Sequence, residues 1–98
     1  MLEQALQKKI LNWLDKQGYW TVKVITCNKN GTNDILACSP TGRFISIEVK
    51  REGLLHTVSK LQQYQIDRIN EIGGVAFAAD SLDMVKEVLN EHEDRANG

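Results

Sequence analysis

The chain has 98 residues, of which 42% are hydrophobic and 26% charged, and its formal charge at pH 7 is −1. This length suits one domain with a single core, and the composition is that of a folded globular protein, which excludes a disordered chain. No apolar run approaches the roughly 20 residues that cross a bilayer, and the N-terminus "MLEQALQKK" lacks the pattern of a secretory signal. We therefore expect a single domain over residues 1–98, located in the cytoplasm, with no membrane partner.

Charged residues are unevenly distributed along the chain. Residues 1–80 contain ten Lys or Arg and eight Asp or Glu, whereas residues 81–98 contain two and five. A metal ion bound to acids of the mildly basic body would make the field at a phosphate more positive. The two cysteines, Cys27 and Cys38, match no zinc spacing, and we expect them to be packing residues of a protein in a reduced compartment.

The first half of the chain predicts one helix followed by three strands. Residues 2–17 carry apolar side chains at helical spacing, and Gly18 is a natural stop. Residues 19–26, "YWTVKVIT", alternate as a strand does, and the turn "NKNGTN" separates them from the short apolar run at 34–38. A second turn, "SPTGR", leads into a third strand at 43–50.

The second half predicts a helix, a strand and a last helix. Residues 57–72 return to helical period through Val58, Leu61, Ile69 and Ile72, and residues 75–79 form a strand. Asp80 or Ser81 caps the last helix, and "EHEDRANG" at 91–98 is expected to be a frayed tail. The order αβββαβα predicts an α/β fold: a central mixed β-sheet flanked by helices, with an antiparallel meander and a last strand joined through a helix crossover.

The stretch "FISIEVK" places polar residues inside a strand. Period two puts Ser46, Glu48 and Lys50 on one face and the aliphatic residues on the other. Ionisable groups buried in a sheet cost several kcal/mol unless they are paired or bind a metal. An ion pair between Glu48 and Lys50 at a solvent-exposed strand end would also explain them.

Asp34 lies at the start of the neighbouring strand. A short antiparallel connection can bring its carboxylate near Glu48, and a divalent cation is the usual way to hold two repelling carboxylates together. Oxygen ligands favour Mg²⁺ or Mn²⁺ over zinc. A turn residue that bonds its own backbone is the alternative interpretation of Asp34.

Three further polar residues point towards apolar faces. Glu3 projects with Ile10 and Leu14 on the first helix, although the helix dipole also favours an acid there. Gln62 and Gln65 lie within the apolar arc of the second helix, where an amide requires hydrogen-bond partners. A shared site explains why several elements each direct a polar group inward.

Asp34 followed by Glu48-Val49-Lys50 in this element order resembles the PD-(D/E)xK nuclease superfamily. "GTND", where Gly-x-Pro-Asp is common, together with "IEVKR", Glu3 and "LQQYQIDRINEIGG", resembles the VRR-NUC family, whose small stand-alone members occur in phages and bacteria. The similarity covers roughly residues 2–80. It implies a restriction-endonuclease-like fold and a cytoplasmic protein, either of a bacterium or of a phage in its host.

The resemblance also implies roles for individual residues. Its metal ligands for Mg²⁺ (or Mn²⁺) correspond to Glu3, Asp34, Glu48 and the backbone carbonyl of Val49. Its catalytic residues correspond to Asp34, Glu48, Lys50 and Gln62. Gln62 fits the family's helix register through Leu61, Ile66, Ile69 and Gly73, whereas Gln65 does not. Asn33 stands where proline is usual, which puts the rigidity of the loop in question.

The implied function is a metal-dependent endodeoxyribonuclease that acts as a homodimer on branched DNA, similar to Holliday-junction resolvases, and needs no organic cofactor. Candidate phosphate contacts are Lys29, Arg51, Lys60 and Arg68. The alternatives are a catalytically inactive DNA-binding or assembly module of the same fold, a nuclease for ordinary duplex or flap DNA, and a hydrolase that uses Cys27 or Cys38 with His56 or His92.

Overall fold

A computed structural model describes the backbone of residues 2–97 and the side chains of residues 2–92. The elements in chain order are α1 (Glu3–Lys16), β1 (Trp20–Lys23), β2 (Ile35–Cys38), β3 (Phe44–Val49), the 3₁₀ helix η1 (Leu55–Thr57), α2 (Lys60–Glu71), β4 (Val75–Ala79) and α3 (Leu82–Asn97). Apart from η1, this is the predicted order. The strands lie side by side as β1-β2-β3-β4, antiparallel except for the β3–β4 pair, as the sequence predicted.

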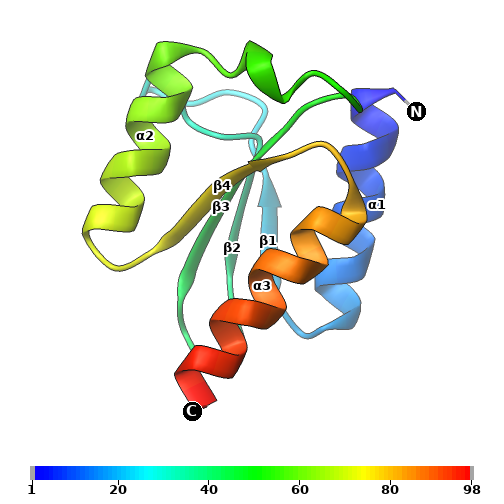
Figure 1. Cartoon of the computed structure of the whole chain (residues 1–98), viewed down its shortest axis with the longest axis vertical. Helices are drawn as coiled ribbons and strands as arrows, with labels where there is room; N and C mark the ends of the chain where they lie inside the picture. Colours follow the sequence, from blue (N-terminus) through cyan, green and yellow to red (C-terminus); the bar gives the residue numbers. More distant parts are fainter. Residues whose placement is uncertain (1, 98) are drawn as a thin grey trace.

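Helices cover both faces of the sheet (Figure 1): α1 and α3 lie on one side and α2 on the other. The side of α1 and α3 holds the core, where Ile45, Ile47 and Val49 of β3 meet Leu6, Ile10 and Leu14 of α1. The strand alternates as predicted, yet all five residues from Ile45 to Val49 are buried because α2 covers the second face of β3. Ser46 and Glu48 are therefore polar residues inside the protein.

Helix α2 differs from its predicted apolar arc. Its one buried residue is Ile66, whereas Leu61 and Ile72 are exposed. The helix also begins later than predicted. Ser59 and Gln62 form a capping box in which each side chain accepts a hydrogen bond from the other's backbone N–H, so the helix begins at Lys60 and Leu61 lies in its first turn.

Several expected boundaries are also corrected. Strand β1 ends at Lys23, three residues short of its predicted end, and α3 continues to Asn97, through the segment where a frayed tail was expected. No glycine or proline interrupts residues 82–97, so nothing in that segment ends the helix before Gly98. Ser81 caps α3 by accepting a hydrogen bond from the backbone N–H of Met84 at 3.1 Å. Within residues 2–97, each helix is too short or too polar to span a bilayer.

Candidate active site

Asp34 and Glu48 meet where β2 begins and β3 ends. The register pairs Ile35 with Ile47, so the residue before β2 faces Glu48 across the two strands. The carboxylate of Asp34 accepts a hydrogen bond from the backbone N–H of Val49 at 2.9 Å. This bond reaches across the strand pair, so Asp34 does more than close its own turn.

Glu48 is the most deeply buried acid of the site, with 2% of its surface exposed. Its pKa rises from the ordinary 4.5 to about 7, first because burial disfavours the charged form and then because of the negative charge of Asp34 and a hydrogen bond between the two carboxyl groups. Lys50 and Asn33 act in the opposite direction but do not cancel these effects. The pair of carboxyl groups thus lacks a full positive counter-charge.

Lys50 follows β3 and lies beside Glu48. Its Nζ is 3.6 Å from Oε2 of Glu48, and 15% of its side chain is exposed. The ion pair of the alternative interpretation is therefore present, but its expected place at a solvent-exposed strand end is wrong, because the acid is enclosed. The lysine reaches from that enclosed carboxylate towards the surface.

Two uncharged residues complete the polar cluster. The side-chain amide of Asn33 donates to Oε1 of Glu48 at 3.3 Å, and its oxygen accepts a hydrogen bond from the hydroxyl of Ser46 at 2.7 Å. The sequence interpretation treated Asn33 only as a departure from proline and gave Ser46 no role. The signal was present, because Ser46 alternates onto the same face as Glu48, but nothing local shows that Asn33 folds back towards it.

Glu3 lies in a neighbouring hollow and outside this cluster. On α1 it lines an open depression with Gln7 and with residues 23–25 at the end of β1. The hollow adjoins the site because the backbone N–H of Val24 donates to the carbonyl of Asp34 at 2.8 Å. Among the described residues, no three His, Cys, Asp or Glu side chains are grouped closely enough to hold a metal ion. Direct ligation by Glu3 together with Asp34 and Glu48 is therefore not preformed.

Gln7, one turn after Glu3, is 7% exposed, and its Oε1 has no hydrogen-bond partner among the described residues. A buried acceptor without a donor is costly. Gln7 lines the open hollow beside Glu3, but its Oε1 is itself shielded from solvent.

The two glutamines of α2 make contacts that the sequence did not predict. The Oε1 of Gln62 accepts the backbone N–H of Ser59 at 2.9 Å, and the Nε2 of Gln65 donates to the carbonyl of Asn30 at 3.0 Å. Among the described residues, Gln62 forms no hydrogen bond with Asp34, Glu48 or Lys50. A catalytic role for Gln62 stays a prediction, and its free amide nitrogen is the group that could serve it.

The loop before β2 is packed against α2. Gly31 has a φ of +80°, and a Cβ atom at that position would lie 2.6 Å from the carbonyl oxygen of Leu61. Glycine is needed here for its backbone conformation and for this close approach. Together with the bond from Gln65, this contact fixes the loop that delivers Asn33 and Asp34.

The predicted phosphate contacts are all exposed side chains: Lys29, Arg51, Lys60 and Arg68. Lys29 and Arg68 line one groove of about 470 Å³ between the loop, the sheet and α2, and Asn33 and Ser46 lie at its inner end. Arg68 also pairs with Glu71 at 3.6 Å on the surface. The groove therefore extends from the basic side chains of Lys29 and Arg68 to Asn33 and Ser46 of the polar cluster.

Cysteine–histidine chemistry finds no support. Both cysteines are exposed, so their expected role in packing is wrong. Cys27 bonds to Asn28 and Thr32, and Cys38 bonds to a backbone carbonyl; neither is hydrogen-bonded to a histidine within the described part of the chain. No cysteine–histidine pair is therefore poised for nucleophilic catalysis.

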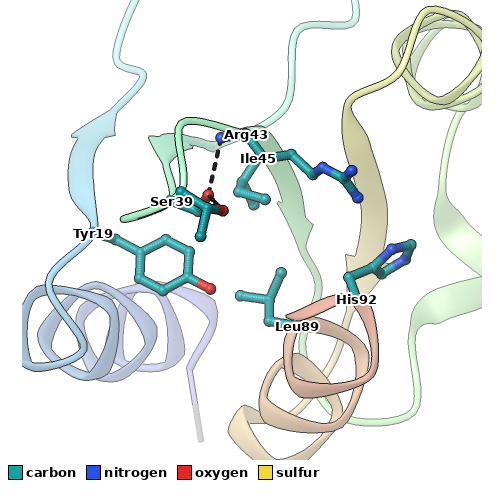
Figure 2. Close-up of a pocket in the computed structure, with 7 residues that line it drawn as sticks. Tyr19, Ser39, Arg43, Ile45, Leu89 and His92 are labelled. Carbon is teal, nitrogen blue, oxygen red and sulfur yellow. Dashed lines mark hydrogen bonds between the residues drawn. The ribbon is translucent and has the colours of Figure 1, made fainter. Parts of the chain in front are cut away.

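A second polar hollow lies at the opposite end of the sheet. Figure 2 shows Tyr19, Ser39, Arg43, Ile45, Leu89 and His92 around it, with the backbone N–H of Arg43 bonded to the hydroxyl of Ser39 at 2.9 Å. Its volume of about 20 Å³ has room for one water molecule. It is too small for a substrate, and the carboxylate cluster is the candidate active site.

The chain matches no protein-family model and no curated protein. Two solved structures share its fold. One, described as "VRR_NUC domain", has a TM-score of 0.76 and 22% sequence identity over 90% of this chain and 94% of its own. The other, "VRR_NUC domain protein", has a TM-score of 0.74 and 19% identity over 92% of this chain and 86% of its own.

These similarities establish the fold of the chain. The mixed four-stranded sheet with helices on both faces is an α/β fold of the restriction-endonuclease-like type. More particularly, the chain has the fold of these VRR-NUC domain structures over most of its length, which is the fold that the sequence resemblance implies.

Proposed function

We propose that this protein is a Mg²⁺- or Mn²⁺-dependent DNA endonuclease that hydrolyses phosphodiester bonds. The observation that carries the proposal is the pair of carboxyl groups of the half-buried Asp34 and the buried Glu48 beside Lys50, at the paired ends of two strands. The shared fold with VRR-NUC domains supports it. Fold alone does not imply activity, so the argument rests on the site.

The donor set fits a hard divalent cation. Asp34 and Glu48 offer carboxylate oxygens, and the raised pKa of Glu48 reflects first its burial and then the negative charge of Asp34, which Lys50 does not offset. We assign the ion to these two side chains and to the backbone carbonyl of Val49. Glu3 would act through a bound water, because it lines a hollow beside the carboxyl pair and is not grouped with it. When bound, Mg²⁺ or Mn²⁺ supplies Lewis acidity and lowers the pKa of a coordinated water.

Lys50 supplies the fixed positive charge. Its ammonium lies beside Glu48 and is partly exposed, so it can reach a phosphate that approaches the site. There it orients the attacking water or stabilises negative charge that develops on the phosphate. We assign it this electrostatic role and not that of proton acceptor.

DNA would approach along the groove between the loop and α2. We assign the phosphate contacts to Lys29 and Arg68, which line the groove, and to the exposed side chains of Arg51 and Lys60. Contacts of this type fix position without reading sequence. We therefore propose that the protein selects DNA by shape, with branched DNA such as a four-way junction as its preferred substrate.

A homodimer would present two sites to the two symmetric strands of a junction. The uncovered part of the α2 side of the sheet supports this assembly. The pairing of Trp20 with Cys38 and of Cys38 with Phe44 places these side chains in one row on that face, and 68% of the surface of Trp20 is exposed. Exposed apolar surface of this kind typically marks an interaction site.

The test of activity compares duplex, flap and four-way-junction DNA in Mg²⁺, Mn²⁺ or EDTA. We expect junction cleavage with either metal and none in EDTA. Unchanged cleavage in EDTA would contradict the metal-dependent mechanism. Cleavage of plain duplex or of a flap as fast as the junction would remove only the junction preference. Binding without cleavage under every condition would favour a catalytically inactive DNA-binding module.

The test of assembly is the mass in solution by light scattering at micromolar concentration. We expect two chains for the wild type and one for Trp20→Glu, because a charge in that apolar row opposes pairing. Ile25→Glu, which changes an exposed residue outside the row, serves as the matched control and should remain a dimer. A wild-type mass of one chain would rule out the dimer, and a dimeric Trp20→Glu variant would rule out this surface.

A further inference from the structure

Two fully buried polar side chains beside the proposed site have no part in the chemistry described so far. Asn33 is 1% exposed and Ser46 is 0% exposed, and they come from different elements, the loop before β2 and the middle of β3. Burying an amide and a hydroxyl is unfavourable unless their hydrogen-bonding groups are satisfied. Their partners therefore indicate what they do.

The hydrogen bonds form a chain that ends on Glu48. The hydroxyl of Ser46 lies 2.7 Å from Oδ1 of Asn33, and Nδ2 of Asn33 lies 3.3 Å from Oε1 of Glu48. Asn33 donates its NH₂ group to Glu48 and accepts the hydroxyl of Ser46 on its oxygen. This is the orientation that an ionised, metal-binding carboxylate requires, because such a carboxylate only accepts hydrogen bonds.

We propose that Asn33 is a positioning residue, held in orientation by Ser46, that fixes the carboxylate of Glu48 for metal binding. Asn33 holds Oε1 while Lys50 stands 3.6 Å from Oε2, so the carboxylate is restrained from both sides. The backbone N–H of Val49 restrains Asp34 in the same way. Both acids are thus oriented before a cation or DNA arrives, which is the role of supporting residues around a metal site.

Asparagine at this position does something that proline cannot. Proline would restrict the backbone of the loop but has no side-chain donor for Glu48. The order that proline would give is supplied from α2, through the bond from Gln65 to the carbonyl of Asn30 and the close packing of Gly31 on Leu61. The loop is therefore held from outside, and residue 33 is free to support Glu48.

The first test detects the hydrogen bonds without reference to activity. In the ¹⁵N-correlated NMR spectrum of the full chain, the side-chain NH₂ signals of Asn33 are assigned by their loss in Asn33→Ala. We expect these signals to shift in Ser46→Ala and in Glu48→Gln. Ser39→Ala is the matched control, because Ser39 is also buried and hydrogen-bonded but lies at the opposite end of the sheet. It should leave the Asn33 signals in place.

The second test is kinetic and rests on the proposed nuclease function. We expect Asn33→Ala to lower kcat for junction cleavage about 10–100-fold, the usual effect of removing a residue that supports a metal ligand, with KM for DNA unchanged. Ser46→Ala should lower kcat less, and the double variant should be no worse than Asn33→Ala, since both act through one chain of bonds. The Mn²⁺ affinity of the protein without DNA should fall in parallel with kcat.

The outcomes separate this proposal from the nuclease function. NMR signals of Asn33 that respond to neither Ser46→Ala nor Glu48→Gln overturn it, whatever the enzyme does. Normal NMR responses in a protein that never cleaves DNA overturn the nuclease function and leave the hydrogen-bonded chain intact. Losses of kcat that multiply in the double variant, or a Ser46→Ala variant with the same kcat as Ser39→Ala, overturn the dependence of Asn33 on Ser46. Should Asn33→Ala not fold, the side-chain signals of Asn33 are assigned in the wild type by through-bond correlation to its own backbone amide, and the Ser46, Glu48 and Ser39 variants then decide between these results.

Discussion

The two faces of strand β3 are buried for different reasons. Ile45, Ile47 and Val49 face α1 and α3 in an apolar core, where each side chain excludes water. Ser46 and Glu48 face α2, are equally enclosed, and are satisfied by hydrogen bonds and one ion pair. The first face stabilises the fold. The second retains a carboxyl group whose pKa is shifted upwards, a cost that a purely structural strand would not bear.

The largest difference between the faces should appear in catalysis. Lys50→Ala removes the fixed positive charge beside Glu48, and we expect junction cleavage to fall about 10²–10³-fold, as when one transition-state donor is removed. Lys16→Ala, an exposed lysine at the end of α1, is the control and should cleave normally. Cleavage by Lys50→Ala at the wild-type rate would remove Lys50 from the mechanism.

On the core face the expected effect is on stability. Ile47 is 0% exposed, so Ile47→Ala should lower the free energy of unfolding by about 2–5 kcal/mol through lost burial and the cavity left behind. The same substitution at Ile25, which is 85% exposed, should change it by less than about 0.5 kcal/mol. Urea unfolding measures both. Equal losses at the two positions would contradict the assigned core.

The polar face should make stability depend on pH. Glu48 has a folded pKa of about 7 against an ordinary 4.5, so between these values the folded state binds more protons than the unfolded state. Its contribution is fully present below pH 4.5 and is lost as pH rises through 7, on the order of 1–3 kcal/mol. Glu48→Gln should lack this decline, and saturating Mg²⁺ or Mn²⁺ should oppose it in the wild type at pH 7.5.

Urea unfolding at pH 4.5 and 7.5, without divalent cations, gives the comparison. Other acids titrate in both proteins, so the informative quantity is the difference between wild type and Glu48→Gln at each pH. A difference that stays constant with pH would show that Glu48 ionises normally.

The smallest expected effects are in α2, where substitutions of Ser59 and Gln62 distinguish a role in capping the helix from a role in catalysis. Ser59→Ala breaks the capping box and should cost about 1 kcal/mol in unfolding free energy while leaving junction cleavage unchanged. Gln62→Ala loses its side of the same box, so a comparable loss of stability is expected. If Gln62 also contacts Lys50 or the attacking water, its variant alone should cleave more slowly. Equal cleavage by both variants would restrict Gln62 to the helix cap.

Much of the fold was predictable because its signals are local. Periodicity in the first helix, the turn residues between strands and the alternation of "FISIEVK" each act over a few residues, and they predicted the element order correctly. The start of helix α2 was predicted less well, because it depends on the capping box of Ser59 and Gln62 and not on the spacing of apolar residues. The site was predictable in part: alternation and a short connection were enough to place Asp34 near Glu48.

The sequence by itself determined that Glu48 and Lys50 point the same way at the end of one strand and that Asp34 lies at the start of the neighbouring strand. Only the tertiary structure decided that α2 encloses this face, that Glu3 stands in a separate hollow, and that Asn33 turns back to Glu48 across 15 residues of sequence. The physical reason is that residue spacing fixes which way a side chain points within its own element. Burial and hydrogen-bond partners depend on how separate elements pack together.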